Sequence, residues 1–180
     1  LYFWFVTPDR PLLPRSQTAR ARRHGRLYAC ELEIDEGSPL CGQSPAELRS
    51  SRGVTVHNII RGGRFVFLRR AKAIAPGDIL VAEASEETLE QLQSEGHVHI
   101  EGLARSPDEG QRVEAVLLPE SVFVGSRIAD LDSLYAIGAN VEGAGITPRR
   151  IEGRLGDIRL AVGDILVLRG DPGALEAEAA

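Results

Sequence analysis

Residues 75–81 read APGDILV, and nearly the same letters return at residues 161–167 as AVGDILV. Working outward, residues 37–42 (GSPLCG) have a counterpart in residues 120–125 (ESVFVG). These matches are separated by 83 to 86 residues. Self-similarity at one separation is typical of a repeated structural unit. The sequence therefore predicts a duplicated module.

The repeat divides the chain into four predicted segments: a leader over 1–26, a first unit over 27–93, a linker over 94–112 and a second unit over 113–180. Units of roughly 65 to 70 residues bury a low fraction of their surface and are marginally stable alone. We expect them to pack on each other or on a second chain.

The leader is predicted to lie beside a membrane. Residues 1–6 (LYFWFV) are aromatic and uncharged, but a bilayer span takes about 20 apolar residues. They are either the end of a membrane helix, a core strand or a cloning remnant. Six arginines follow between residues 10 and 26, an excess that the positive-inside rule expects on the cytoplasmic side. A nucleic-acid arm is disfavoured because the rest of the chain is acidic and would repel phosphate: of 21 basic and 26 acidic residues, 15 and 25 lie outside residues 9–26.

The two cysteines indicate a reducing compartment. Cys30 and Cys41 form no Cys-x-x-Cys pair and no framework typical of secreted proteins. Both are small apolar side chains, and we expect them to be reduced and buried, as in cytosolic proteins.

The first unit shows clear element signals. Residues 28–34 alternate apolar and polar, which predicts a strand. Ser44, Pro45 and Glu47 form a helix-start pattern, and Gly62-Gly63 is a hairpin turn signal. The predicted elements are, in order, a strand at 28–34, a helix at 45–51, strands at 54–61, 64–68 and 79–84, a helix from Ser85, and an edge strand at 97–100.

The second unit is predicted to repeat this order. Its expected elements are a strand at 113–118, a helix at 127–134, strands at 140–146, 149–154 and 164–169, and a final helix capped by Asp171 and Pro172. Gly143 and Gly145 interrupt its second strand. Glycine within a strand indicates a bulge or a close approach of backbone.

Motifs of catalysis are missing from the sequence. It contains no phosphate-binding Gly-x-x-x-x-Gly-Lys loop, no Gly-x-Ser-x-Gly elbow and no His-Glu-x-x-His pair. Residues 143–145 (GAG) are only the start of a dinucleotide fingerprint. His97 and His99 share a strand face without further ligands nearby, so we expect a solvated linker and no metal site. We therefore predict that the chain is not an enzyme and holds no cofactor.

Charged residues near the repeat have both a structural and a functional interpretation. Asp78 and Asp164 follow glycine at a strand entry, where an aspartate normally bonds its own turn backbone, although paired carboxylates are the alternative. Arg69, Arg70 and Lys72 form either a solvated loop or a contact for phosphate or an acidic neighbouring surface.

These patterns together resemble the TrkA-C, or RCK-C, domain. The residues that carry the resemblance are 31–34 (ELEI), 37–42 (GSPLCG), Leu48, 53–56 (GVTV), 59–63 (IIRGG) and 76–81 (PGDILV). Residues 114–173 resemble a second such domain. The run 154–166 is similar to the later of two tandem TrkA-C domains in the cytoplasmic loop of permeases of the divalent-anion:sodium symporter class.

The resemblance implies an α+β fold of two tandem units, each with the order strand, helix, strand, strand, strand, helix around a small mixed or antiparallel sheet. It also implies a homodimer that holds small ligands between subunits, and some family members bind cyclic dinucleotides. A cyclic dinucleotide or another nucleotide is therefore a possible ligand, and no other cofactor is expected. The matching positions are Leu48, Arg49, Val56, His57, Asn58 and Ile60, beside Arg61. We take Arg49, His57, Asn58 and Arg61 as candidate ligand-binding residues.

The expected function is that of a cytoplasmic regulatory region of an inner or plasma membrane transporter of the anion/sodium symporter type. Its partners would be the membrane-embedded part of the same polypeptide, a second copy and a small-molecule effector, with no nucleic acid. Two alternatives stay open: a purely structural oligomerisation module, and a regulatory subunit of a potassium uptake or channel system.

Overall fold

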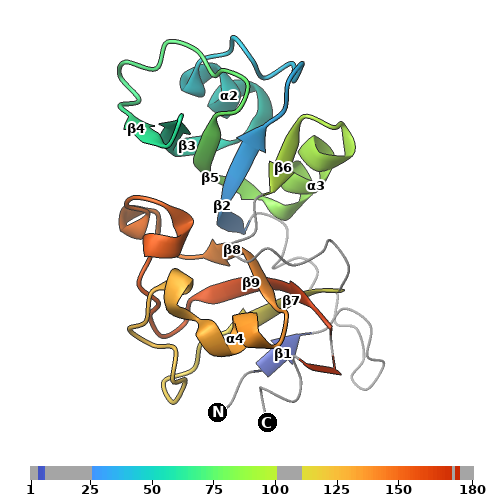
Figure 1. The fold of residues 1–180 in the computed structure, drawn as a ribbon, viewed down its shortest axis with the longest axis vertical. Helices are drawn as coiled ribbons and strands as arrows, with labels where there is room; N and C mark the ends of the chain where they lie inside the picture. The colour runs from blue at the N-terminus through green and yellow to red at the C-terminus, as the bar shows by residue number, and fades with distance from the viewer. Residues whose placement is uncertain (1–3, 7–25, 101–110, 172, 175–180) are drawn as a thin grey trace.

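The repeated APGDILV and AVGDILV stretches each lead into the central strand of a three-strand group. The structure is a computed structural model that describes residues 4–6, 26–100, 111–171 and 173–174. We call residues 26–100 the first half and the described residues from 111 onward the second half. Figure 1 shows the first half above the second, with β2 and β8 between them.

In the first half, the central strand is β5 (Ile79–Ser85), which pairs with β2 (Leu27–Ile34) on one side and β3 (Thr55–Arg61) on the other. A hairpin joins β3 to β4 (Arg64–Val66), and β6 (Val98–Ile100) pairs with β2. The hairpin turn is the predicted Gly62-Gly63, with φ of 56° and 74°. Positive φ at both positions is what a tight turn of this hand requires.

In the second half, the central strand is β9 (Ile165–Gly170), between β7 (Gln111–Val116) and β8 (Asn140–Gly145). β1 (Trp4–Val6) pairs with β7, so the apolar start of the chain contains a strand. The rest of the basic leader lies outside the described residues, apart from Arg26.

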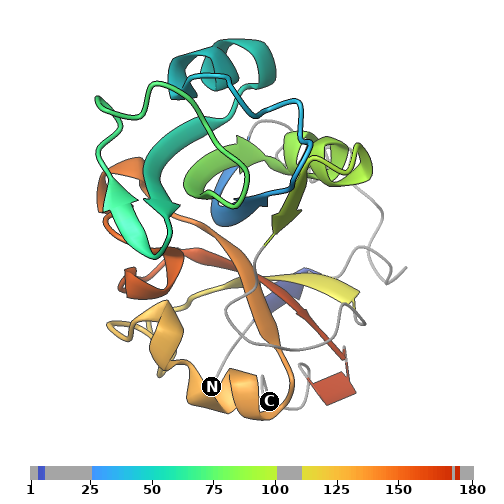
Figure 2. The same cartoon turned by 45° about the horizontal axis from the view of Figure 1, so that its top comes forward.

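All strand pairs are antiparallel, and they join into one nine-stranded sheet with the order β1-β7-β9-β8-β2-β5-β3-β4 and β6 beside β2. The two halves meet in this sheet through one residue pair, Ala29 with Ala144. Figure 2 shows the strands of the first half above those of the second half.

The first half carries the two longest described helices. α2 (Pro45–Arg52) starts at Ser44, whose side chain accepts the Glu47 N–H while the Glu47 carboxylate accepts the Ser44 N–H. This is the capping box that the sequence predicts. α3 (Glu86–Ser94) starts at Ser85 in a similar way, with the Thr88 N–H as donor.

Two predictions for the second half are wrong. The helix expected at 127–134 is divided into a 3₁₀ turn, η1 (Ile128–Asp130), and α4 (Asp132–Ala136), because Leu131 leaves the helical region with ψ of 54°. The strand expected at 149–154 is replaced by the 3₁₀ turns η2 (Pro148–Arg150) and η3 (Leu155–Asp157). Proline fixes a helix-compatible φ at the start of η2.

The buried hydrophobic side chains form two clusters, and each cluster contains residues of both halves. The cluster built mainly from the second half includes Ala29, Ile60 and Val81 of the first half. The cluster built mainly from the first half includes Ile165 and Val167 of the second. Thus the halves pack on each other within one chain, the first of the two arrangements that their small size predicts.

Candidate ligand-binding site

Each repeated stretch contains a buried aspartate that holds its own turn, as predicted. The Asp78 carboxylate accepts the Ala75 N–H at 2.9 Å, and the Asp164 carboxylate accepts the Ala161 N–H at 2.8 Å. The turn also recurs in the backbone. The Gly77 N–H donates to the Ile34 carbonyl at 2.8 Å, and the Gly163 N–H donates to the Leu117 carbonyl at the same distance.

Each aspartate is also held by an arginine. Arg61 donates through Nε and Nη2 to the two Asp78 oxygens, both at 2.7 Å, and Arg150 donates to Asp164 at 2.7 and 2.8 Å. These hydrogen bonds to a carboxylate raise the pKa of both guanidinium groups. Each arginine then reaches a backbone carbonyl, that of Ala73 or Arg159. We call each Arg–Asp pair with its turn a clamp.

The sequence did not predict that Arg61 and Arg150 bind the clamp aspartates. Arg61 precedes Asp78 by 17 residues, whereas Arg150 precedes Asp164 by 14. The arginines also come from unlike elements, since Arg61 ends β3 and Arg150 ends η2. Because neither the spacing nor the element is shared, the repeat pattern carried no signal for this contact.

Charged side chains connect the halves on both sides of their junction. Glu31, which is buried, accepts hydrogen bonds from the Arg154 side chain and from the Leu155 N–H. Glu114 accepts one from the Tyr28 hydroxyl at 2.5 Å. Burial, followed by that hydrogen bond, raises the pKa of Tyr28 to about 12. Each half therefore offers a glutamate to donors of the other.

A bulge occurs at the same place in β3 and β8, and each bulge carries a titratable side chain. The extra residue of β3 is His57, whose Nε2 lies 2.9 Å from a Glu83 oxygen. The extra residue of β8 is Glu142, which accepts a hydrogen bond from Arg169 on β9. The order of the partners is reversed: β3 carries the histidine opposite an acid on β5, whereas β8 carries the acid opposite an arginine on β9.

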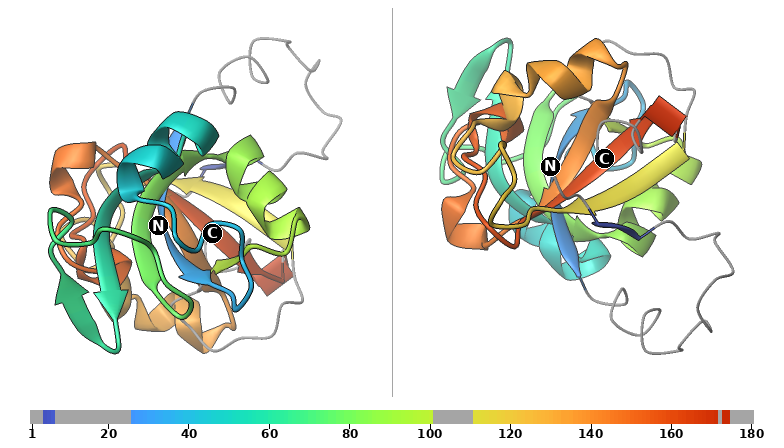
Figure 3. Two further views of the ribbon diagram at one scale, coloured as in Figure 1. Left: turned by 90° about the horizontal axis from the view of Figure 1, so that it is seen from above. Right: turned by 90° about the horizontal axis from the view of Figure 1, so that it is seen from below.

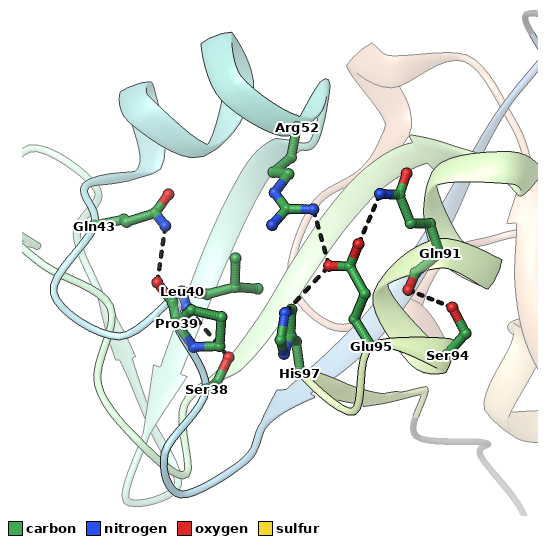
Figure 4. A network of polar contacts seen from close by, with 9 residues as sticks. All are labelled: Ser38, Pro39, Leu40, Gln43, Arg52, Gln91, Ser94, Glu95 and His97. Carbon is green, nitrogen blue, oxygen red and sulfur yellow. Dashed lines mark hydrogen bonds and ion pairs between the residues drawn. The ribbon is translucent and has the colours of Figure 1, made fainter.

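A pocket opens between α2 and α3. It has a volume of about 260 Å³ and is lined by Ser51, Arg52, Thr88, Gln91 and Leu92. Figure 4 shows the polar network beside it, in which the Glu95 carboxylate accepts hydrogen bonds from Arg52 at 2.9 Å and Gln91 at 2.7 Å. His97 lies 3.1 Å from the same carboxylate.

The four candidate residues do not share one pocket. His57 and Asn58 lie at the β3 bulge, where the Asn58 amide donates to the Gly153 carbonyl of the second half at 3.0 Å. Arg61 belongs to the first clamp. Arg49 lies exposed on α2, the helix that also carries the pocket residues Ser51 and Arg52. Their role in ligand binding stays a prediction.

The described residues hold no group of three or more histidine, cysteine or acidic side chains placed to bind a metal ion. His97 contacts Glu95, and His99 lies on β6. Both described cysteines are free. Cys30 is buried, and desolvation raises the pKa of its thiol to about 12. Cys41 is only half-buried, which corrects the expectation for that residue.

Gly143 marks a close approach, as predicted from its position in a strand. A Cβ atom added there would lie 2.9 Å from the Ala29 carbonyl oxygen of β2. Glycine is therefore needed where β8 meets β2.

Among the residues that the structure describes, no helix is long and apolar enough to cross a bilayer.

Part of the chain is similar to a known domain family and to curated transporters. Residues 30–95 match the TrkA-C domain. The chain is also 29% identical to Uncharacterized transporter YfbS of Escherichia coli over 171 residues, or 86% of the chain and 26% of that protein.

A second relative is Uncharacterized transporter sll0640 of Synechocystis, which is 28% identical over 159 residues, or 79% of the chain and 26% of that protein. The chain thus spans about a quarter of the length of each of these curated relatives. No solved structure matches the chain.

Proposed function

We propose that this chain is a cytoplasmic regulatory region of a membrane transporter, of the divalent-anion:sodium symporter type, without catalytic activity. The match to the TrkA-C domain and two relatives named as transporters support the regulatory role. The symporter type rests on the resemblance of residues 154–166 to the tandem domains of such permeases.

We further propose that the second half is a second TrkA-C-like unit, although the family match ends at residue 95. The observation that carries this proposal is the recurrence of the clamp. In each half the equivalent aspartate, Asp78 or Asp164, accepts hydrogen bonds from the backbone of its own turn and from an arginine side chain. The central strand also has equivalent neighbours in the two halves, in the order β2-β5-β3 and β7-β9-β8.

Regulation would work by a shift of population between two arrangements. A small ligand that binds one arrangement better shifts the equilibrium toward it by its difference in affinity. An attached membrane part that prefers one arrangement then responds, and this coupling is reciprocal. A nucleotide or cyclic dinucleotide is the proposed class of ligand, and a homodimer is the proposed assembly.

A thermal-shift screen tests ligand sensing. The purified chain is mixed with nucleotides, cyclic dinucleotides, divalent anions and metal ions while its oligomeric state is measured by light scattering. A ligand at 100 times its Kd stabilises a fold by about 2.7 kcal/mol, which is visible as a rise in Tm. If nothing shifts the Tm of a stable oligomer, the purely structural module is the better description.

Variants then locate the site. Arg49→Ala and Asn58→Ala test the positions implied by the resemblance, and Arg52→Ala tests the pocket between α2 and α3. Arg149→Ala is the matched control, because Arg149 is exposed in the second half. The proposed site requires that the ligand shift be lost in a tested variant and kept in the control.

Transport is tested with the longer protein that contains this chain. The proposal requires sodium-driven uptake of a divalent anion such as sulfate, and a response of that uptake to the ligand found in the screen. Uptake or flux of potassium alone would instead favour the alternative of a potassium-transport regulator.

A further inference from the structure

An aromatic and basic surface lies at the free edge of the first half. β4 is the terminal strand of the sheet on that side, so among the described residues one of its backbone edges has no neighbouring strand. The chain continues from β4 into a segment whose exposed side chains are Arg64, Phe65, Phe67, Arg69, Arg70 and Lys72. We call these six residues the edge patch.

The phenylalanines are held outward by the packing of their neighbours. Val66 and Leu68 pack against the first-half core, and Ala71 is buried within it. Within β4, alternation turns Phe65 to the side opposite Val66, whereas Phe67 follows the end of the strand at the start of a turn. Their exposed fractions are 57% and 75%, the latter the highest among the large hydrophobic side chains described.

The positive charge of the edge patch is uncompensated. Residues 62–77 contain four basic side chains and no acidic one. Of the residues that the structure describes, none forms an ion pair with Arg64, Arg69, Arg70 or Lys72. The Arg70 guanidinium lies over the Phe67 ring, 5.8 Å from its centroid, so charge and aromatic surface are presented together.

The remainder of the chain has the opposite sign. The formal net charge is −5, so without these four cations the chain would carry −9. The acids Glu86, Glu87 and Glu90 lie on α3, and Figures 1 and 3 show α3 on the opposite side of the first half from β4. These acids therefore do not lie next to the edge patch, and repulsion between separated exposed charges is screened over a Debye length of about 8 Å.

We propose that the edge patch docks on a membrane surface rich in anionic lipids, with Phe65 and Phe67 inserted at the headgroup level and the four cations against lipid phosphates. Aromatic side chains flanked by arginine and lysine suit this interface, where apolar area and charge both contribute to binding. A symmetric contact with a second copy is a poorer fit, since it would place four cations against four. The proposal goes beyond regulation by a ligand and stands whether or not one is sensed.

Vesicle sedimentation tests the proposal. The whole chain is mixed with vesicles of phosphatidylcholine alone or with 30% phosphatidylglycerol (about one lipid in three, enough for a clear negative surface potential). Binding is expected only to the anionic vesicles. Arg69→Glu with Arg70→Glu should lower the partition coefficient by at least about tenfold. The matched control, Arg127→Glu with Arg149→Glu, makes the same change of charge at exposed arginines of the second half.

The arginines of residues 10–26 also attract anionic lipid. A variant of the two phenylalanines distinguishes binding by the edge patch from binding by these arginines. Phe65→Ser with Phe67→Ser changes no charge and should lower binding by at least about tenfold. The control, Val122→Ser with Val162→Ser, removes side chains that are 61% and 53% exposed elsewhere. Binding equal to that of the unmodified chain in the Phe65/Phe67 variant would overturn the proposal, as would no binding to anionic vesicles at all.

Fluorescence gives a second readout. The chain has one tryptophan, so Trp4→Phe combined with Phe67→Trp places the only indole in the edge patch. Its emission should shift to shorter wavelength with anionic vesicles and stay constant with neutral ones. A shift with single-stranded oligonucleotide but none with vesicles would overturn the membrane assignment in favour of nucleic acid.

Discussion

Asp78 and Asp164 are buried carboxylates at strand entries, a costly position for a charge that has no partner. The cost of burying each carboxylate is offset by hydrogen bonds from a backbone N–H of its own turn and from a bidentate arginine. An arginine suits this role better than a lysine, because its planar fork matches both carboxylate oxygens. The clamp therefore fixes the turn and the start of the central strand together.

Arg61→Ala should lower the free energy of unfolding by about 2 kcal/mol, since it leaves the Asp78 carboxylate buried without the two hydrogen bonds that Arg61 donates. The cost stays below that of a fully buried pair because the Arg61 side chain is 44% exposed and partly screened by water. Arg150→Ala should have a similar effect. Urea unfolding measures both.

Arg64→Ala is the control for these variants, because it removes an exposed arginine of the same hairpin and should change stability by less than about 0.5 kcal/mol. If Arg61→Ala is no more destabilising than Arg64→Ala, the clamp contributes nothing measurable.

At the scale of single residues, sequence reasoning succeeded where a rule is local. The Asp78 turn bond, the Ser44 cap and the Gly62-Gly63 turn each involve residues within four positions of one another. It missed contacts such as Arg61 with Asp78 and Arg154 with Glu31, which are separated by 17 and 123 residues. Such contacts depend on how the strands align, which no local pattern encodes.

Among the elements, β8 shows how one strand is adapted to another. Gly143 lies at its bulge, and the Ala29 carbonyl of β2 occupies the space where a side chain would begin. The strand predictions for β2, β3, β5 and β9 were accurate because alternation and β-branched runs are strong signals. The second-half predictions at 127–134 and 149–154 failed because short 3₁₀ turns have no comparable periodicity.

Gly143→Ala should destabilise the protein by about 1 to 3 kcal/mol, the usual cost of overpacking, since the new Cβ would lie 2.9 Å from the Ala29 oxygen. Gly145→Ala is the matched control in the same strand. Its new Cβ would meet the Ile165 side chain at 3.3 Å, a milder contact. Neither glycine has positive φ, so no backbone strain complicates the comparison.

Denaturant unfolding with hydrogen exchange of the β2 and β8 amides measures the effect. We expect faster exchange along both strands in Gly143→Ala. Equal stability of the two glycine variants would mean that the approach of β8 to β2 relaxes without cost.

For the whole molecule, the exchange of core residues makes the halves interdependent. Ile165 and Val167 complete the first-half cluster, and Ile60 and Val81 complete the other. The repeat in the sequence predicted two small units that need a neighbour, and size alone was enough for that inference. It could not say which faces meet, because the apolar residues of β5 and β9 are alike on both faces.

Calorimetry of the chain should therefore show one unfolding transition, with both halves lost together. The Tm should fall as pH rises from about 9 toward 12. Burial raises the pKa of Cys30 from 9.0, and of Tyr28 and Tyr135 from 10.0, to about 12 in the folded state. Over this range the unfolded chain ionises and the folded one does not, so unfolding is favoured.

Near-ultraviolet absorbance, which reports tyrosine ionisation, checks the assignment: Tyr28 and Tyr135 should ionise only as the fold is lost. Two separate transitions at neutral pH would contradict the coupling of the halves. A Tm that stays constant up to pH 12 would contradict the role of these three groups.

The two bulges carry their acid on opposite partners, in His57 with Glu83 and in Glu142 with Arg169, and this difference has a consequence for how the sequence can change. In an assembly of two identical subunits, every substitution appears on both sides of the axis at once. Here the two sides are encoded separately, so a substitution in one is not copied into the other. Each side of the junction is free to evolve its own chemistry, and any effector it holds need not be symmetric itself.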